Sequence, residues 1–268
     1  MVNFQKKESY NVDDLRTIME ILRSDEGCPW DREQNHVSVR KNFLEETYEV
    51  LEAIDSGDTE LLKEELGDVL MQVVFHARME EEIGSFNLDD VADGVCKKLI
   101  LRHPHVFGDV QVENADEVLK NWDAIKKKEK HQESFTETLQ NVPKVLPALM
   151  RAEKVQHRAA RAGVDFADEF DALNALQEKI AELGDVLDDG DLNNLDEVMG
   201  DIFFDCVNVA RFFHVDSEKC LTKATETFIN RFRRVEELAA GQSMTMDKAD
   251  SDTLARLWNQ AEDEEKTN

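Results

Sequence analysis

The sequence predicts an all-α protein built from two tandem copies of one helical-bundle module. Glycine and proline are scarce, at 11 and 4 of 268 residues, and Ala, Leu, Glu, Asp and Lys dominate, which favours helices throughout. A spacing pattern centred on a glycine occurs once in each half, and such internal repetition predicts a duplicated fold. We expect a first module over residues 1–130, a linker over 131–143 and a second module over 144–268.

Apolar residues recur at helical spacing along the first half. Helices are expected over Asp13–Arg23, Ser38–Asp55, Thr59–Ile83, Leu88–Arg102 and Ala115–Glu129. Glycine and proline interrupt the pattern at 25–31 and 103–108, so both segments are expected to be loops. Residues 126–143 are charged and short of large apolar side chains, which is typical of a linker. In the second half, a helix over 146–161 and a turn at Gly190 correspond to 13–23 and to a turn at Gly57.

Four acidic residues stand symmetrically about Gly57: Glu46, Glu49, Glu65 and Asp68. Glu49 and Glu65 each lie 8 residues from the glycine, and Glu46 and Asp68 each lie 11 residues from it. If two antiparallel helices flank the turn, the members of each pair lie level, and the i,i+3 spacing keeps both acids of a helix on one face. Four converging carboxylates repel one another unless a cation lies among them, and their hard oxygens suit Mg²⁺ or Mn²⁺.

In an acid-rich chain, such pairs are also found on solvated helix faces, which is the alternative interpretation. Here the acids are interleaved with core-forming side chains such as Phe43, Val50 and Leu66. Acids among apolar neighbours cost free energy unless they have a role, so the pattern favours a metal site.

Basic residues of the first half complement a phosphorylated ligand. Lys98 and Arg102 are one helical turn apart, as are Trp122 and Lys126. Arg102 can hold two phosphate oxygens in a fork, and the lysines act as point charges. Metal-holding acids together with these cations suit a polyphosphate, and Glu45 is the candidate to orient or deprotonate an attacking water.

The second half lacks part of this set. Counted outward from the second glycine, the four acid positions read Lys179, Glu182, Val198 and Asp201. The positions of the cations and the tryptophan read Thr227, Arg231, Trp258 and Glu262. Neither lysine nor valine ligates Mg²⁺, so a complete metal-and-anion site is expected only within residues 1–130.

Composition excludes several classes of function. The net charge is −27, from 59 acidic and 32 basic residues, so the surface repels duplex DNA or RNA and anionic membranes. The four cysteines show no zinc-site spacing and are expected to be reduced thiols of a cytoplasmic protein. The sequence has no apolar signal-peptide core and no stretch of membrane-spanning length. It has no Walker A glycine loop, which excludes a P-loop NTPase.

The text Glu45-Glu46-x-x-Glu49 followed by Glu65-x-x-Asp68 resembles the signature of the MazG nucleoside triphosphate pyrophosphohydrolases, of the all-α NTP pyrophosphatase superfamily. The GCPWD text at 27–31 and the RHPHVF text at 102–107 are similar to family text as well. The resemblance covers nearly the whole chain, including the tandem duplication of the long bacterial form. It implies Mg²⁺-dependent hydrolysis of NTPs or dNTPs to monophosphate and pyrophosphate, for house-cleaning or nucleotide-pool control, by a homodimer of intertwined helical bundles.

The resemblance also implies a role for each matching residue. The metal ligands would be Glu46, Glu49, Glu65 and Asp68. Glu45 would act on water, while Lys98, Arg102 and Lys126 would hold phosphates. The nucleotide site would include Trp122, with Trp30 and Asp31 as further candidates. A degenerate second site would consist of Glu178, Glu182, Asp201, Arg231 and Trp258.

Two other interpretations of the sequence stay open. One is a nucleotide-sensing or partner-binding regulatory protein with little turnover, which the altered second half favours. The other is a purely structural helical dimer with acidic faces, which predicts no stabilisation linked to Mg²⁺. The preferred base and sugar, and whether alarmones are substrates, are not indicated by the sequence.

Overall fold

The computed structural model describes residues 4–129, 134–190 and 192–267. Within these ranges every regular element is a helix and no strand occurs, so the predicted all-α class is confirmed. The chain divides into two compact units, Met1–Lys126 and Lys127–Asn268. Among the helices of the described ranges, none is both long and apolar enough to cross a bilayer.

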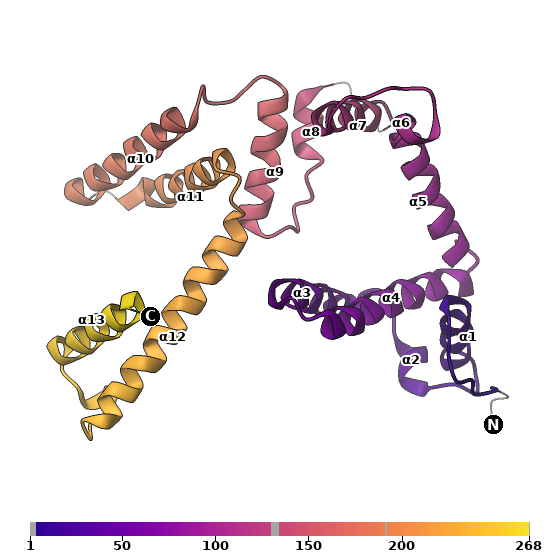
Figure 1. Cartoon of the computed structure of the whole chain (residues 1–268), viewed down its shortest axis with the longest axis horizontal. Helices are drawn as coiled ribbons and strands as arrows, with labels where there is room; N and C mark the ends of the chain where they lie inside the picture. The colour runs from indigo at the N-terminus through magenta and orange to yellow at the C-terminus, as the bar shows by residue number, and fades with distance from the viewer. Residues whose placement is uncertain (1–3, 130–133, 191, 268) are drawn as a thin grey trace. The chain divides into compact units, whose positions relative to one another are not determined.

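Unit 1 is organised around a pair of long antiparallel helices. Its helices are α1 (Val12–Leu22), α2 (Pro29–Glu33), α3 (Arg40–Ser56), α4 (Thr59–Glu82), α5 (Leu88–Arg102) and α6 (Pro104–Phe107), and α7 (Ala115–Glu129) begins within it. The pair is α3 and α4, which lie side by side, with α1 and α5 against α4 (Figure 1). This pair is called hairpin 1 below.

The turn of hairpin 1 is encoded locally by three residues. Gly57 ends α3 with φ of 70°, a left-handed conformation that costs glycine little. Asp58 then begins α4, since its side chain accepts hydrogen bonds from the backbone N–H groups of Glu60 and Leu61. A helix stop followed at once by a helix start brings the two helices back antiparallel.

The core of unit 1 lies at the end of α4 away from this turn. Its buried cluster consists of Met19, Val39, Val74, Phe75 and Met79. Arg23 adds an ion pair with Glu82 at 2.8 Å and lies over the ring of Phe75. The apolar residues nearer the turn stay exposed, Ile54 and Leu66 among them, so one face of hairpin 1 is uncovered within its own unit.

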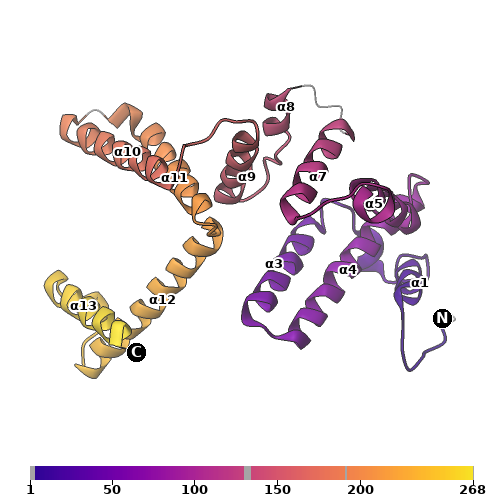
Figure 2. The ribbon, with the colours of Figure 1, turned by 45° about the horizontal axis from the view of Figure 1, so that its top comes forward.

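Unit 2 contains a similar pair, called hairpin 2. Its helices are α8 (Phe135–Gln140), α9 (Ala148–Arg161), α10 (Glu169–Asp189), α11 (Leu195–Phe212), α12 (Ser217–Gly241) and α13 (Ser251–Thr267), with 3-10 turns η1 (Leu192–Asn194) and η2 (Met246–Lys248). Helices α10 and α11 form the pair, and Gly190 ends α10 with φ of 68° (Figure 2). A second core cluster joins α12 to α13: Val235, Ala239, Leu257 and Ala261.

Three segments differ from the sequence-based expectation. The expected loops at 25–31 and 103–108 contain the short helices α2 and α6, because proline at the first position of a helix needs no backbone donor and fixes a helical φ. The expected linker 131–143 contains α8, which begins with a capping box at Ser134 and packs on α9. Val142 is only 1% exposed, so residues 134–143 are part of unit 2, while 130–133 lie outside the described residues.

Candidate metal and nucleotide site

Hairpin 1 gathers three of the four predicted carboxylates. One carboxylate oxygen from each of Glu46, Glu49 and Glu65 lies within 4.8 Å of the others. Glu46 and Glu49 come from one face of α3, one turn apart, and Glu65 comes from the facing side of α4. Hard oxygen donors at this separation can move onto one divalent cation with side-chain rotation alone, so the arrangement fits Mg²⁺ or Mn²⁺.

Electrostatics within the cluster are unfavourable in the absence of a cation. The pKa of Glu46 is raised by partial burial and then by the charges of Asp68, Glu49 and Glu65. The pKa of Glu65 is raised by desolvation and by its acidic neighbours, Glu49 and Asp68 foremost. Asp68 is outside the group of three, yet it is close enough for its charge to act on both, which is consistent with its predicted place beside them.

Glu45 points away from the three acids. Its carboxylate pairs with Lys41 at 2.9 Å, one turn earlier on α3, and raises the pKa of that lysine. Adjacent residues on a helix are rotated by about 100°, so Glu45 leaves the face that carries Glu46. To act on a water at the metal site, its side chain would have to exchange this ion pair for a new position.

The predicted phosphate-binding residues and Trp122 lie on α5 and α7. Arg102 is buried, and its guanidinium lies 5.3 Å from the ring centre of Trp122. His103 makes a T-shaped contact with the same tryptophan, with ring centres 4.9 Å apart, so Arg102 and His103 both hold the indole in place. Lys98 is exposed on α5, and Lys126 is partly buried on α7. Arg102 of α5 therefore lies against Trp122 of α7, although the sequence pattern placed the two residues in separate pairs.

Trp30 and Asp31 lie on α2, which the sequence did not predict. Trp30 is 60% exposed, so its indole is available to a ligand rather than part of the core of unit 1. Asp31 lies inside α2 and its backbone carbonyl accepts a hydrogen bond from Arg23. Asp31 is therefore an interior residue of α2, because Pro29 begins the helix two residues earlier.

Hairpin 2 places an ammonium between its acids. Lys179 Nζ lies 2.9 Å from Glu182 Oε2 and 3.0 Å from Asp201 Oδ2. These two hydrogen bonds raise the pKa of Lys179, so it stays protonated. Val198 is buried, and Glu178 is exposed on α10.

The remaining residues of the second set lie on α12 and α13. Arg231 lies 5.2 Å from the ring centre of Trp258, which parallels the contact of Arg102 with Trp122. Arg231 also pairs with Glu265 at 2.8 Å and with Glu262 at 3.7 Å. The guanidinium is thus already engaged by two carboxylates of its own unit.

Sequence reasoning missed a histidine pair in unit 1. His36 Nε2 lies 2.6 Å from Glu80 Oε1, and the Nδ1 atoms of His36 and His76 are 2.7 Å apart. Phe43, at the start of α3, meets His76 edge-on. The network ties the segment before α3 to α4 at the end of hairpin 1 opposite the turn. The partners of His36 lie 40 and 44 residues away along the chain, so no local spacing could have indicated them.

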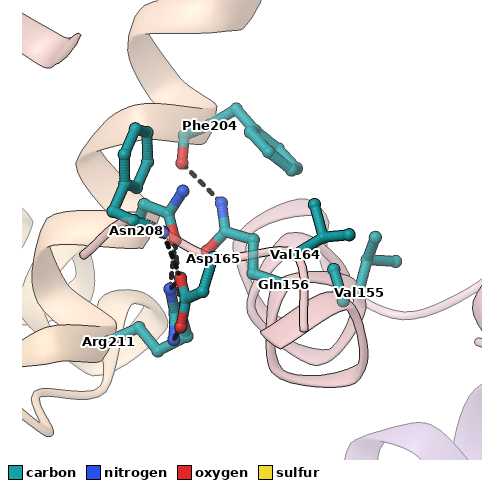
Figure 3. A pocket seen from close by; sticks show the side chains of 9 residues that line it. Val155, Gln156, Val164, Asp165, Phe204, Asn208 and Arg211 are labelled. Atoms are coloured by element: carbon teal, nitrogen blue, oxygen red, sulfur yellow. Dashed lines mark hydrogen bonds and ion pairs between the residues drawn. The ribbon is translucent and has the colours of Figure 1, made fainter. Parts of the chain in front are cut away.

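A pocket of about 280 Å³ in unit 2 was also missed (Figure 3). On one side, buried Arg211 donates to the carboxylate of Asp165 and to Asn208 Oδ1. On the other side Gln156 donates to the carbonyl of Phe204 at 2.7 Å. These bonds tie α9 and the segment after it to α11. Asp165 neutralises the arginine, so the polar residues of this pocket are explained by their structural role.

Comparison with known proteins supports this description. Residues 34–107 match the MazG nucleotide pyrophosphohydrolase domain. The chain is 42% identical over 260 residues to the nucleoside triphosphate pyrophosphohydrolase of Escherichia coli, covering 95% of this chain and 98% of that protein. It is 39% identical over 262 residues to the nucleoside triphosphate pyrophosphohydrolase/pyrophosphatase MazG of Thermotoga maritima, covering 98% and 100%. The acid motif of hairpin 1 lies within the matched domain, and the chain belongs to the MazG nucleotide pyrophosphohydrolase family.

Proposed function

We propose that the protein is a Mg²⁺-dependent nucleoside triphosphate pyrophosphohydrolase, acting on NTPs or dNTPs and releasing the monophosphate and pyrophosphate. The observation that carries the proposal is the convergence of three glutamates from facing helices within 4.8 Å. The names of the full-length relatives agree with it. Water would attack the α-phosphorus, the bond from that phosphorus to the bridging oxygen would break, and pyrophosphate would leave.

Glu46, Glu49, Glu65 and Asp68 would hold Mg²⁺, with Mn²⁺ as a substitute. The bound ion would neutralise phosphate charge and polarise the phosphoryl oxygens. The chain's own contribution to proton transfer would come from Glu45. Its carboxylate would first break the ion pair with Lys41 and then accept a proton from the attacking water. Arg102 and the two lysines Lys98 and Lys126 would balance the charge of the pyrophosphate.

Recognition of the base would use aromatic surfaces. Exposed Trp30 can stack on a base without regard to its identity, since every base has a π-face. Trp122 contacts both Arg102 and His103, so its role would be to position the arginine beside the nucleotide. A site that relies on stacking favours broad base preference, as expected of house-cleaning or nucleotide-pool control.

We further propose that the two units are tandem copies of one module and that the protein is a homodimer in the cytoplasm. Glycines with the same left-handed conformation end α3 and α10, and an arginine lies on a tryptophan in each unit. The exposed apolar face of hairpin 1 supports an obligate partner. The four cysteines are free thiols, as in a reducing compartment. Light scattering at micromolar concentration should give a dimer, and a monodisperse monomer would contradict the assembly.

The deciding experiment is turnover on a panel of NTPs and dNTPs with Mg²⁺, with identification of the first products. Monophosphate and pyrophosphate are expected, and a nucleoside diphosphate with orthophosphate would refute the proposal. Tight binding of nucleotides with negligible turnover would instead favour the regulatory alternative. A purely structural protein would show neither turnover nor Mg²⁺-linked stabilisation.

A further inference from the structure

Lys179 bridges the two helices of hairpin 2. It lies on α10, one turn before Glu182, and its Nζ contacts that glutamate at 2.9 Å. The same nitrogen contacts Asp201, on the facing helix α11, at 3.0 Å. Two of the three ammonium hydrogens are thereby directed at carboxylates of different helices, which is the bridging role that a divalent ion has between helices.

The position of this ammonium matches the acid cluster of hairpin 1. Gly57 and Gly190 end α3 and α10 with φ of 70° and 68°, so positions counted from them can be compared. Lys179 and Glu46 both lie 11 residues before their glycine. Where hairpin 1 has three carboxylates within 4.8 Å of one another, hairpin 2 has two carboxylates and a cation between them.

We infer that the Lys179 ammonium is a covalently tethered cation that occupies hairpin 2 in place of a divalent metal, so that each chain holds one metal centre and not two. The inference rests on the proposed function only in taking hairpin 1 as the metal-binding counterpart.

The surroundings of Lys179 agree with this role. Val198, the counterpart of Glu65, is 2% exposed and offers no ligand. Asp205, one turn after Asp201 on α11, is a further acid in reach: burial and Asp201 raise its pKa, and the charge of Lys179 lowers it. Removal of the ammonium would therefore leave three acids without a counter-ion, a composition close to that of hairpin 1.

A tethered cation has a consequence that an exchangeable ion does not. An ammonium on a side chain does not dissociate when the metal concentration falls, so hairpin 2 keeps its helix-to-helix contact in metal-free protein. Hairpin 1, by contrast, gains or loses its counter-ion with the medium. Metal-linked changes in stability are then confined to unit 1.

The test uses the full chain with Glu49→Gln and Glu65→Gln, which leave hairpin 1 only two of its four predicted metal ligands, Glu46 and Asp68. In this parent, Mn²⁺ binding is measured by isothermal titration calorimetry and by the shift in melting temperature. We expect the parent to bind no Mn²⁺ at a defined site. Adding Lys179→Glu should restore one Mn²⁺ per chain and a rise in melting temperature of about 5–10 °C at metal about a hundredfold above Kd.

Lys179→Met in the same parent is the matched variant, since it removes the ammonium without adding a ligand. Weaker but saturable Mn²⁺ binding is expected there, through the three acids that remain, and circular dichroism checks that each variant is folded. Defined Mn²⁺ binding by the parent itself would overturn the inference. The inference would also be overturned if the folded Lys179 variants bound no more Mn²⁺ than the parent. If the Lys179→Glu variant does not fold, the result with Lys179→Met decides. Failure of the proposed function would be seen separately, in wild-type protein that binds no Mn²⁺ and releases no pyrophosphate.

Discussion

Replacing Glu46 with glutamine should make the protein more stable without metal and less stable with it. Glu46→Gln keeps the size of the side chain and its place on α3, but removes one negative charge and a strong ligand. In the metal-free protein this charge lies with those of Glu49 and Glu65 within 4.8 Å. Burial and those neighbours already raise the pKa of Glu46, which shows that its ionised form is disfavoured there.

The size of the effect follows from Coulomb's law. Two carboxylates at 4.8 Å repel by about 0.9 kcal/mol in bulk water, and Glu46 has two such neighbours, so Glu46→Gln should raise the metal-free stability of unit 1 by about 1–2 kcal/mol. A bulk dielectric is appropriate because the site is partly exposed. With Mg²⁺ at about a hundred times Kd, the wild type gains about 2.7 kcal/mol, most of which the variant should lose. Glu46→Gln is therefore expected to be more stable than the wild type without Mg²⁺ and less stable than the wild type with it.

Thermal and urea unfolding with EDTA or with Mg²⁺, followed by tryptophan fluorescence, would measure both effects. Glu52→Gln is the matched control, because Glu52 is an exposed residue of α3 outside the group of three. Turnover by Glu46→Gln should also fall by orders of magnitude. If both variants shift stability equally, or if Mg²⁺ stabilises Glu46→Gln as much as wild type, the cluster is a solvated acidic face.

Three further predictions concern other parts of the chain. Asp68→Asn should nearly abolish pyrophosphate release, whereas Asp201→Asn at the matching position of hairpin 2 should leave the initial rate within a few-fold; the reverse order would show that hairpin 2 is the working site. Gly27→Ala should lower the free energy of unfolding in urea by about 1–3 kcal/mol, since the new Cβ would lie 2.2 Å from the carbonyl oxygen of Ile21. Gly184→Ala in the open interior of α10 should instead stabilise by about 0.5–1 kcal/mol, and similar losses at both glycines would contradict this. Burial and His36 lower the pKa of His76, so its contribution to the free energy of unfolding should be full above the ordinary pKa of histidine and fall as the pH drops through the lowered pKa. His76→Gln should flatten this dependence of stability on pH, measured by urea titrations at several pH values. An unchanged slope would assign the pH dependence to other groups.

Much of the candidate site could be predicted from the sequence because its geometry is local. The i,i+3 spacing of Glu46 and Glu49 places them on one face whatever else the chain does. Gly57 and Asp58 specify a helix stop and a helix start, and the equal distances from Gly57 then bring Glu65 level with Glu49. The contact of Arg102 with Trp122 was not predicted, since the spacing paired each of them only with a residue one turn away on its own helix.

Some local predictions were wrong because proline can either end a helix or begin one. Pro29 and Pro104 indicated loops, yet each begins a short helix. The missing N–H and the ring of proline disrupt only the interior of a helix, whereas its fixed φ suits the first turn. Residues 134–143, which were expected to be linker, contain the short helix α8 and the buried Val142.

The sequence by itself determined the helical class, the acid motif and the loss of two acids in hairpin 2, since these depend on residue type and short spacing. Only the tertiary structure decided that Lys179 reaches Asp201 on the other helix, that Glu45 turns to Lys41, and that His36 meets His76. Such contacts depend on which rotamers the packed helices allow and on residues far apart in the chain. Chain spacing fixes the backbone of a hairpin, but the direction of a charged side chain is set by the nearest opposite charge in three dimensions.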